Sequence, residues 1–248
     1  MSDKLIAIVP AAGVGERAWE SGPEHLSRPK QYRLLRREPM LRHAVRALLA
    51  DARIDQVLVA VAADDAWADS ALAGLPRTVV RACGGPTRAQ TVMAALRHAQ
   101  PGSKDWALVH DAARPGLPAQ ALARLIDHCF EQDAGGLLAL PLADTIKRGA
   151  VLDRDACLLT GGAGVAQAGH AVQSTVDRTD LWAAQTPQMF RALELLRALE
   201  QAHGAKRPVT DEASAMELAG HKPRLVQGSA RNFKVTWPED FELMEKWL

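Results

Sequence analysis

Short apolar runs alternate with amphipathic segments along the first half of this chain. The apolar runs have the length and character of buried strands: Leu5–Val9, Gln56–Ala62, Thr78–Arg81, Trp106–His110 and Leu137–Pro141. Between them, Met40–Ala50, Thr87–Ala99 and Ala119–Gln132 place apolar residues three and four positions apart, which predicts helices with one apolar face each. Strands and helices in alternation predict βαβ units. Right-handed crossovers assemble such units into an α/β fold with a doubly wound, mostly parallel sheet.

The pattern changes in the second half. Between Asp144 and Ser174 the periodicity fails and glycines gather in Thr160–Gly169, which predicts a flexible, protruding arm rather than a core element. After the arm we expect two helices, a strand and a last helix: Arg191–His203, Asp211–Ala219, Arg224–Gln227 and a helix from Pro238. A length of 248 residues with 48% hydrophobic composition is typical of one α/β domain. We therefore expect a single domain over residues 1–248, with the arm at about 144–174.

Charge and cysteine content narrow the classes of partner. Lys and Arg number 30 against 29 Asp and Glu, a net charge of +1, whereas general nucleic-acid binding needs a basic surplus. Cys83, Cys129 and Cys157 are widely spaced, which indicates neither a disulfide framework nor a zinc site and suits a reducing compartment. No signal-peptide pattern or long apolar window occurs. We expect a cytoplasmic protein that binds neither nucleic acid nor membrane.

The loop after the first strand has the character of a phosphate-binding turn. Pro10–Arg17 is rich in small residues, so backbone N–H groups can approach an anion, and Pro29-Lys30-Gln31 follows along the chain. The segment Gly13–Ala18 also satisfies the G-x-G-x-x-[GA] pattern of dinucleotide-binding folds. That pattern requires a long helix directly after it, which Gly22 and two later prolines interrupt. No P-loop or G-x-S-x-G motif is present.

Two further loops carry polar residues just after predicted strands. One contains Gly84-Gly85 with Arg88 and Thr91, and the other is His110–Pro115. The carboxyl ends of parallel strands meet at one edge of the sheet, so three such loops predict a ligand crevice there. Simpler interpretations remain open at this stage. Thr87 could cap a helix beside an ordinary surface arginine, and Asp111 could be a helix N-cap.

The motifs and their order resemble those of the 2-C-methyl-D-erythritol 4-phosphate cytidylyltransferase family. The resemblance covers nearly the whole chain and rests on these segments: Pro10–Arg17, Pro29–Tyr32, Gly84–Thr91, His110–Pro115, Asp144–Arg148, Thr175–Trp182, Gln185–Gln188, Thr210–Ala215 and Asn232–Asp240. It implies a Rossmann-like nucleotidyltransferase that joins CTP to 2-C-methyl-D-erythritol 4-phosphate. The implied products are 4-diphosphocytidyl-2-C-methyl-D-erythritol, an isoprenoid precursor, and pyrophosphate. The implied cofactor is a divalent cation, normally Mg²⁺.

The chemistry of that reaction calls for cations rather than a base. A phosphate monoester has a second pKa of about 6, so its oxygen is already a nucleophile at neutral pH. Two polyanions must nevertheless meet, and each pair of unit charges 4 Å apart costs roughly 4 kcal/mol at an effective dielectric constant near 20. The resemblance implies that Arg17 and Lys30 offset this repulsion at the α-phosphorus. The simpler interpretation of Lys30 is a solvated lysine among neighbouring arginines.

The resemblance also assigns roles in substrate binding. It implies that the backbone of the small-residue loops and one hydroxyl hold the nucleotide: Ala11, Ala12, Gly13, Gly85 and Thr91. Arg88 would support the second loop, and Asp111 would lie near the ribose, the metal or the acceptor. Residues that would hold the acceptor phosphate are Lys234 and Arg178, assisted by Arg114, Thr145, Thr186 and Thr210. Arg178 could instead form a surface ion pair with Asp177 or Asp180. The sequence does not identify protein ligands of the metal.

The predicted arm has a functional interpretation in the family. There Thr145 and Arg178 reach the acceptor from the neighbouring subunit, which implies a homodimer with shared active sites. Two other functions stay open at the level of sequence. One is a ribitol-5-phosphate cytidylyltransferase, which differs in the acceptor pocket, and the other is a catalytically silent nucleotide-binding protein.

Overall fold

The computed structural model describes residues 3–13, 29–152 and 169–248. It consists of two compact units: residues 1–140 with 184–248, and residues 141–183. The second unit contains the range 144–174 in which the sequence predicts an arm. Whether the whole chain behaves as one domain stays a prediction.

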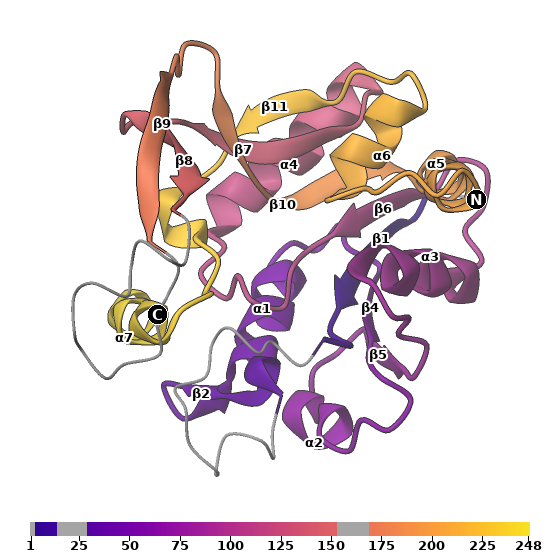
Figure 1. Cartoon of the computed structure of the whole chain (residues 1–248). Helices are drawn as coiled ribbons and strands as arrows, with labels where there is room; N and C mark the ends of the chain where they lie inside the picture. The colour runs from indigo at the N-terminus through magenta and orange to yellow at the C-terminus, as the bar shows by residue number, and fades with distance from the viewer. Residues whose placement is uncertain (1–2, 14–28, 153–168) are drawn as a thin grey trace. The chain divides into compact units, whose positions relative to one another are not determined.

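A mostly parallel sheet forms the centre of the first unit. Within the described ranges it has seven strands in the order β11-β7-β10-β6-β1-β4-β5 (Figure 1). Their bounds are β1 Leu5–Pro10, β4 Gln56–Ala60, β5 Thr78–Arg81, β6 Trp106–Val109, β7 Gly136–Pro141, β10 Trp182–Arg191 and β11 Arg224–Gln227. Strand β1 pairs in parallel with β4 and β6, whereas β10 runs antiparallel to β6. The predicted α/β class is confirmed.

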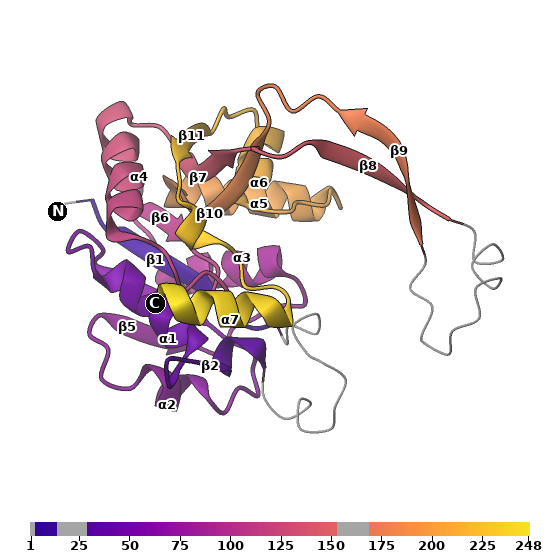
Figure 2. The ribbon, with the colours of Figure 1, turned by 90° about the vertical axis from the view of Figure 1, so that its left-hand side faces the viewer.

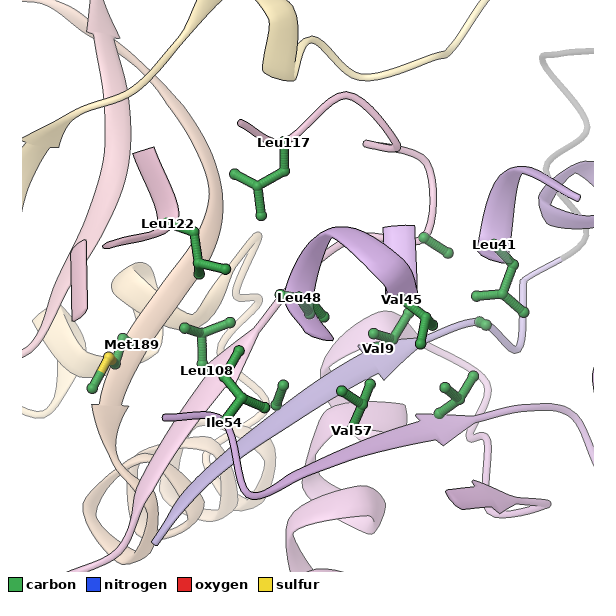
Figure 3. Close-up of a cluster of buried hydrophobic side chains, with 14 of the residues drawn as sticks. Val9, Leu41, Val45, Leu48, Ile54, Val57, Leu108, Leu117, Leu122 and Met189 are labelled. Atoms are coloured by element: carbon green, nitrogen blue, oxygen red, sulfur yellow. The ribbon is translucent and has the colours of Figure 1, made fainter. Parts of the chain in front are cut away.

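Helices cover both faces of this sheet (Figure 2). On one face lie α1 Met40–Leu49, α2 Ala68–Leu72 and α4 Ala119–Gln132; on the other lie α3 Arg88–Ala99, α5 Ala192–Gly204 and α6 Glu212–Leu218. Successive residues of a strand point to opposite faces. Val9 therefore packs with α1 residues such as Val45, whereas Ile8 packs with α3 residues such as Val92. Figure 3 shows part of the first of these two clusters, with Val9 and Val45 among its labelled side chains.

Smaller elements complete the first unit. They are a 3₁₀ helix Lys30–Tyr32, strands β2 Leu34–Leu35 and β3 Glu38–Pro39, a 3₁₀ helix Ala230–Asn232, and α7 Pro238–Trp247. Helix α7 buries Phe241 and Met244 against Leu35 and Met40. This packing holds the chain around Lys234 close to the segment that follows Lys30.

The predicted elements agree with the structure where apolar runs are continuous. Helix α4 and strands β5 and β11 have the predicted bounds, and β4 ends at Ala60 rather than Ala62. The apolar pattern of the sequence does not predict strand β10. Its buried positions include Gln185, Thr186 and Gln188, which interrupt the apolar pattern by which a core strand is recognised.

The second unit contains a two-stranded antiparallel sheet. Strand β8 Ile146–Val151 pairs with β9 His170–Val176, with an irregularity between Arg148 and Gly149. The sequence analysis predicts an arm here and assigns no strands to it, whereas the structure shows that the described part of this range forms two strands. Every position of these two strands is exposed or half-buried, so the hydrophobic periodicity of a core element is missing. Most of the glycine-rich tip lies outside the described residues.

Within the described residues, no helix has both the length and the apolar character that crossing a bilayer requires.

Candidate active site

The three predicted loops meet around one cavity of the first unit. Its volume is about 350 Å³. The residues that line it follow the ends of β1, β5 and β6 or belong to two other segments, one near Lys30 and one at Lys234: Pro10–Gly13, Lys30, Gln31, Met40, Gly85–Arg88, Thr91, Asp111–Ala113 and Lys234. The sequence-predicted residues Ala11, Ala12 and Gly13 thus lie beside the predicted cations Lys30 and Lys234. Their functional roles stay predictions.

Lys30 is anchored on the chain next to Lys234. Its Nζ donates a hydrogen bond to the carbonyl oxygen of Val235 at 2.8 Å. The next residue, Gln31, is buried and donates through Nε2 to the carbonyl oxygen of Ala11 at 2.7 Å. These two bonds tie the Lys30 segment to the first loop and to the C-terminal region at once. Lys30 is therefore held at the cavity rather than on a solvated face.

The second loop packs directly on the first. A side chain at Gly84 would place its Cβ 2.2 Å from the Cβ of Ala12, so this approach requires glycine. The Thr91 hydroxyl accepts from the Gly85 N–H at 3.1 Å and donates to the Thr87 carbonyl at 3.0 Å. Thr87 is the N-cap of α3 and accepts from the Gln90 N–H at 3.2 Å, so the capping interpretation is confirmed. Thr91 holds the shape of the loop.

Asp111 is the centre of a cluster of charges. Its Oδ1 accepts from Arg88 Nε at 2.8 Å, its Oδ2 accepts from Lys234 Nζ at 2.8 Å, and Arg114 Nε lies 3.9 Å from Oδ2. Burial would raise the pKa of Asp111, but Arg88, Lys234 and Arg114 outweigh it and lower this pKa well below the ordinary value. The carboxylate is therefore ionised. The N-cap interpretation of Asp111 is wrong, because α4 begins at Ala119 with Pro118 as its N-cap.

Arg88 is shared between Asp111 and a residue that sequence reasoning missed. Glu212, the first residue of α6, is 1% exposed and accepts two hydrogen bonds from the Arg88 guanidinium. Burial opposes the charged form of Arg88, yet the carboxylates of Glu212 and Asp111 prevail and raise its pKa. For Glu212, burial dominates and raises the pKa, with Arg88 acting against it. Arg88 is thus not an ordinary surface cation.

A buried hydrogen-bond chain supports Asp111 from behind. The Asp111 N–H donates to Thr186 Oγ1 at 3.0 Å, and Thr186 Oγ1 lies 3.1 Å from His110 Nδ1. His110 Nε2 lies 3.0 Å from the Arg114 carbonyl, which can only accept, so Nε2 carries the proton and Nδ1 accepts from Thr186. Burial lowers the pKa of His110 to about 4, and the imidazole is neutral. Thr186 therefore positions the Asp111 loop.

Four further predicted residues have contacts or exposure that the structure describes. Arg114 donates to the Asn232 carbonyl at 2.7 Å, and Thr210 is exposed and donates through its N–H to Ser214 Oγ. In the second unit Thr145 is exposed, and Arg178 is exposed and donates to the Leu142 carbonyl at 3.3 Å. Among the described residues Arg178 forms no ion pair with Asp177 or Asp180. Arg17 lies outside the described residues.

The cavity suits a cation that arrives with phosphates. Across the described ranges, no group of three or more His, Cys, Asp and Glu side chains is placed to hold a metal ion. Asp111 is the carboxylate among the residues that line the cavity. Mg²⁺ is commonly bound through one or two carboxylates together with substrate phosphates and water, so one carboxylate fits this ion when a triphosphate supplies further oxygens.

Comparison with known proteins gives one consistent result. Residues 5–248 match the sequence model of the 2-C-methyl-D-erythritol 4-phosphate cytidylyltransferase family. A protein of that name from Bordetella pertussis is 62% identical over 248 residues, with 100% of both chains covered. Another from Laribacter hongkongensis is 49% identical, covering 97% of this chain and 94% of the relative. The solved structure of the Francisella tularensis enzyme of that name has a TM-score of 0.78 at 28% identity, covering 99% of this chain and 100% of that chain.

Proposed function

Because this chain belongs to the 2-C-methyl-D-erythritol 4-phosphate cytidylyltransferase family, we propose that it transfers CMP from CTP to 2-C-methyl-D-erythritol 4-phosphate. The chain is a nucleotidyltransferase, and the acceptor proposed for it is the one in the family's name, 2-C-methyl-D-erythritol 4-phosphate. The observation that supports the proposal most is the cavity at the carboxyl ends of the strands. There Lys30, Arg88 and Lys234 line one cavity together with loops of small residues.

The residues of the cavity match the needs of this reaction. An oxygen of the acceptor phosphate attacks the α-phosphorus of CTP, a new P–O bond forms, the bond to the β-phosphate breaks, and pyrophosphate leaves. The acceptor dianion needs no side-chain base. Lys30 and Lys234 lower the repulsion between the two anions and are held in place before the substrates bind, so little reorganisation is needed.

The loops provide the contact surface for the nucleotide. The backbone of Ala11, Ala12 and Gly13, together with Gly85, lines the cavity without bulky side chains. Backbone N–H and C=O groups can then approach a base and its phosphates closely. Thr91 contributes by holding Gly85 in position.

Mg²⁺ is the expected cofactor, with Asp111 as its protein ligand. The ion would neutralise charge on the triphosphate when bound. Binding of Mg²⁺ would compete with Arg88 and Lys234 for the Asp111 oxygens, since both oxygens accept from these cations. Calorimetric titration of CTP with and without Mg²⁺, on wild-type protein and on Asp111→Asn, tests this assignment. It predicts that Mg²⁺ strengthens CTP binding to the wild type more than to the variant.

A homodimer with shared sites is the expected assembly. The hairpin of β8 and β9 exposes apolar side chains, including Val151 and Val172, which a second copy of the chain could cover. Thr145 and Arg178 of this hairpin unit would then act in the partner's site. Location in the cytoplasm also stays a prediction.

A pyrophosphate-release assay tests the proposed function. Purified protein is incubated with Mg²⁺, one of the four common nucleoside triphosphates, and either 2-C-methyl-D-erythritol 4-phosphate or ribitol 5-phosphate. The proposal predicts turnover with CTP and the branched tetritol phosphate, and much slower turnover with every other combination. Faster turnover with ribitol 5-phosphate would show that ribitol 5-phosphate is the acceptor instead. CTP binding without any turnover would indicate a catalytically silent nucleotide-binding protein.

A further inference from the structure

Glu212 lies behind the cavity and is not among the residues that line it. Its side chain is 1% exposed, and Oε1 and Oε2 accept from Arg88 Nη1 at 2.7 Å and Nη2 at 3.0 Å. A carboxylate taken out of water is costly unless a cation and hydrogen bonds compensate for the lost hydration. Arg88 supplies both, and it lines the cavity. Arg88 is therefore the cavity-lining residue to which the Glu212 carboxylate is hydrogen-bonded.

The geometry of the guanidinium transmits the position of Glu212 to Asp111. The group is planar and rigid, so fixing its two terminal nitrogens also sets the direction of Nε. Arg88 Nε donates to Asp111 Oδ1 at 2.8 Å, while Asp111 Oδ2 accepts from Lys234 Nζ at 2.8 Å. Negative and positive groups thus alternate from Glu212 to Lys234.

The residues on either side of Glu212 are hydrogen-bonded to the central sheet. Gln188 of β10 donates through Nε2 to Asp211 Oδ2 at 2.8 Å and accepts through Oε1 from the Ala213 N–H at 2.7 Å. Asp211 caps α6 by accepting from the Ser214 N–H at 2.9 Å. Glu212 lies between two residues that are tied to a central strand. These bonds hold the backbone at Glu212 in place, and its carboxylate is held by Arg88.

We propose that Glu212 is a positioning residue for nucleotidyl transfer: it fixes the Arg88 guanidinium and, through Arg88 and Asp111, sets the place of the Lys234 ammonium at the cavity. The catalytic part of this inference rests on the proposed function. Without the Glu212 charge, Asp111 is the carboxylate left to Arg88, and Arg88 then competes with Lys234 for it. Lys234 loses its fixed position, although Glu212 touches neither Lys234 nor substrate.

Kinetics of matched variants test the inference. Glu212→Gln keeps the size of the side chain without its charge, and Glu212→Asp keeps the charge. The control is Glu200→Gln, because the 40% exposed side chain of Glu200 pairs with Arg97 at the other end of α3, with Nη2 and Oε1 2.8 Å apart. We expect Glu212→Gln to raise the KM for the acceptor phosphate about tenfold or more and to lower kcat, Glu212→Asp to recover part of the loss, and Glu200→Gln to match the wild type.

The KM separates positioning from a merely structural role. Loss of folded protein lowers the apparent kcat and leaves both KM values unchanged. An unchanged acceptor KM in Glu212→Gln, or a Glu212→Asp variant that is as impaired as Glu212→Gln, would overturn the proposal.

A second measurement needs no turnover. In ligand-free protein, hydrogen exchange of the Arg88 Nε–H is followed by NMR, with the signal assigned by its absence in Arg88→Lys. We expect exchange at least about tenfold faster in Glu212→Gln than in wild type and unchanged exchange in Glu200→Gln. Wild-type exchange in Glu212→Gln would refute the positioning of Arg88. Should the wild type transfer no CMP, the proposed function fails, and the exchange rate alone decides whether Glu212 fixes Arg88.

Discussion

Two cations expected at the acceptor phosphate lie in different surroundings. Lys234, in the first unit, has a side chain that is 42% exposed, yet its Nζ is bonded to Asp111, which is 8% exposed and also bonded to Arg88. Arg178, in the second unit, is exposed and donates to the Leu142 carbonyl at 3.3 Å. A cation that is already held in place loses little conformational entropy when substrate binds, whereas a long exposed side chain loses rotamer freedom. We therefore predict that Lys234 needs little reordering when substrate binds, and that Arg178 in the second unit becomes ordered only when it meets substrate, which under the proposed homodimer would lie in a partner copy.

The largest expected effect is that of Lys30→Ala. Lys30 is held at the cavity by the Val235 carbonyl, and under the proposed function its charge would offset the negative charge that builds up as pyrophosphate leaves. We expect kcat to fall by at least about a hundredfold, while the dissociation constant for CTP changes by less than about tenfold. Pyrophosphate release and calorimetric CTP binding measure the two quantities.

The matched control for Lys30 is Lys222→Ala. Lys222 is exposed and lies outside the residues that line the cavity, so its removal should leave kcat unchanged. A Lys30→Ala protein with near wild-type kcat would show that the preorganised Lys30 ammonium does not contribute to catalysis.

The next effect concerns Arg178 and the proposed sharing of sites. Lys30→Ala and Arg178→Ala proteins are each expected to be nearly inactive alone. After subunit exchange half of the dimers are mixed, and one of the two sites in each mixed dimer is intact, so about a quarter of wild-type activity should return. Native mass spectrometry of the mixture confirms the exchange, and pyrophosphate release measures the activity.

Absence of recovery despite complete exchange would mean that Arg178 acts in its own subunit's site or in none. The contrast between Lys234 and Arg178 would then no longer hold, because Arg178 of the second unit would not need the site of a partner copy.

The sequence predicts those parts of the molecule whose signals are local. Strand β6 is a continuous apolar run, and α4 has a regular apolar stripe, so both were found close to their observed bounds. Strand β10 was missed because its buried glutamines are satisfied by distant partners, such as Asp211 for Gln188. Burial of polar residues depends on such partners, and no local periodicity records them.

The same distinction applies to the site. The glycine loops and the residues after strand ends are local features, and they led to Lys30, Arg88 and Asp111. Glu212 lies 124 residues from Arg88 along the chain, so their pairing exists only in the folded protein. The local signals were its place in the Thr210–Ala215 segment of the family resemblance and its acidic character at the start of a predicted helix. Neither points to Arg88, and the second is typical of a helix on any surface.

A smaller effect is expected from Thr186→Val, which tests how much the buried hydrogen bonds behind Asp111 stabilise the first unit. The change keeps the shape of a 4% exposed side chain and removes the hydroxyl between the Asp111 N–H and His110 Nδ1. Two buried polar groups lose their partner, so the free energy of unfolding should fall by about 2 to 4 kcal/mol. Urea denaturation measures it, and a loss below about 0.5 kcal/mol would show that the hydrogen-bond chain contributes little.

The smallest effect is expected from Thr175→Val, the same chemical change in the hairpin unit. Thr175 lies on β9, is exposed, and accepts from Lys147 Nζ at 2.7 Å across the two strands. Water replaces this exposed bond readily, and valine is a good strand former, so the free energy of unfolding should change by less than about 0.5 kcal/mol in either direction. The same urea titration compares both threonines. A loss as large as that of Thr186→Val would mean that the hairpin is held by its own side chains, and the contrast between an ordered first unit and a dependent second unit would no longer stand.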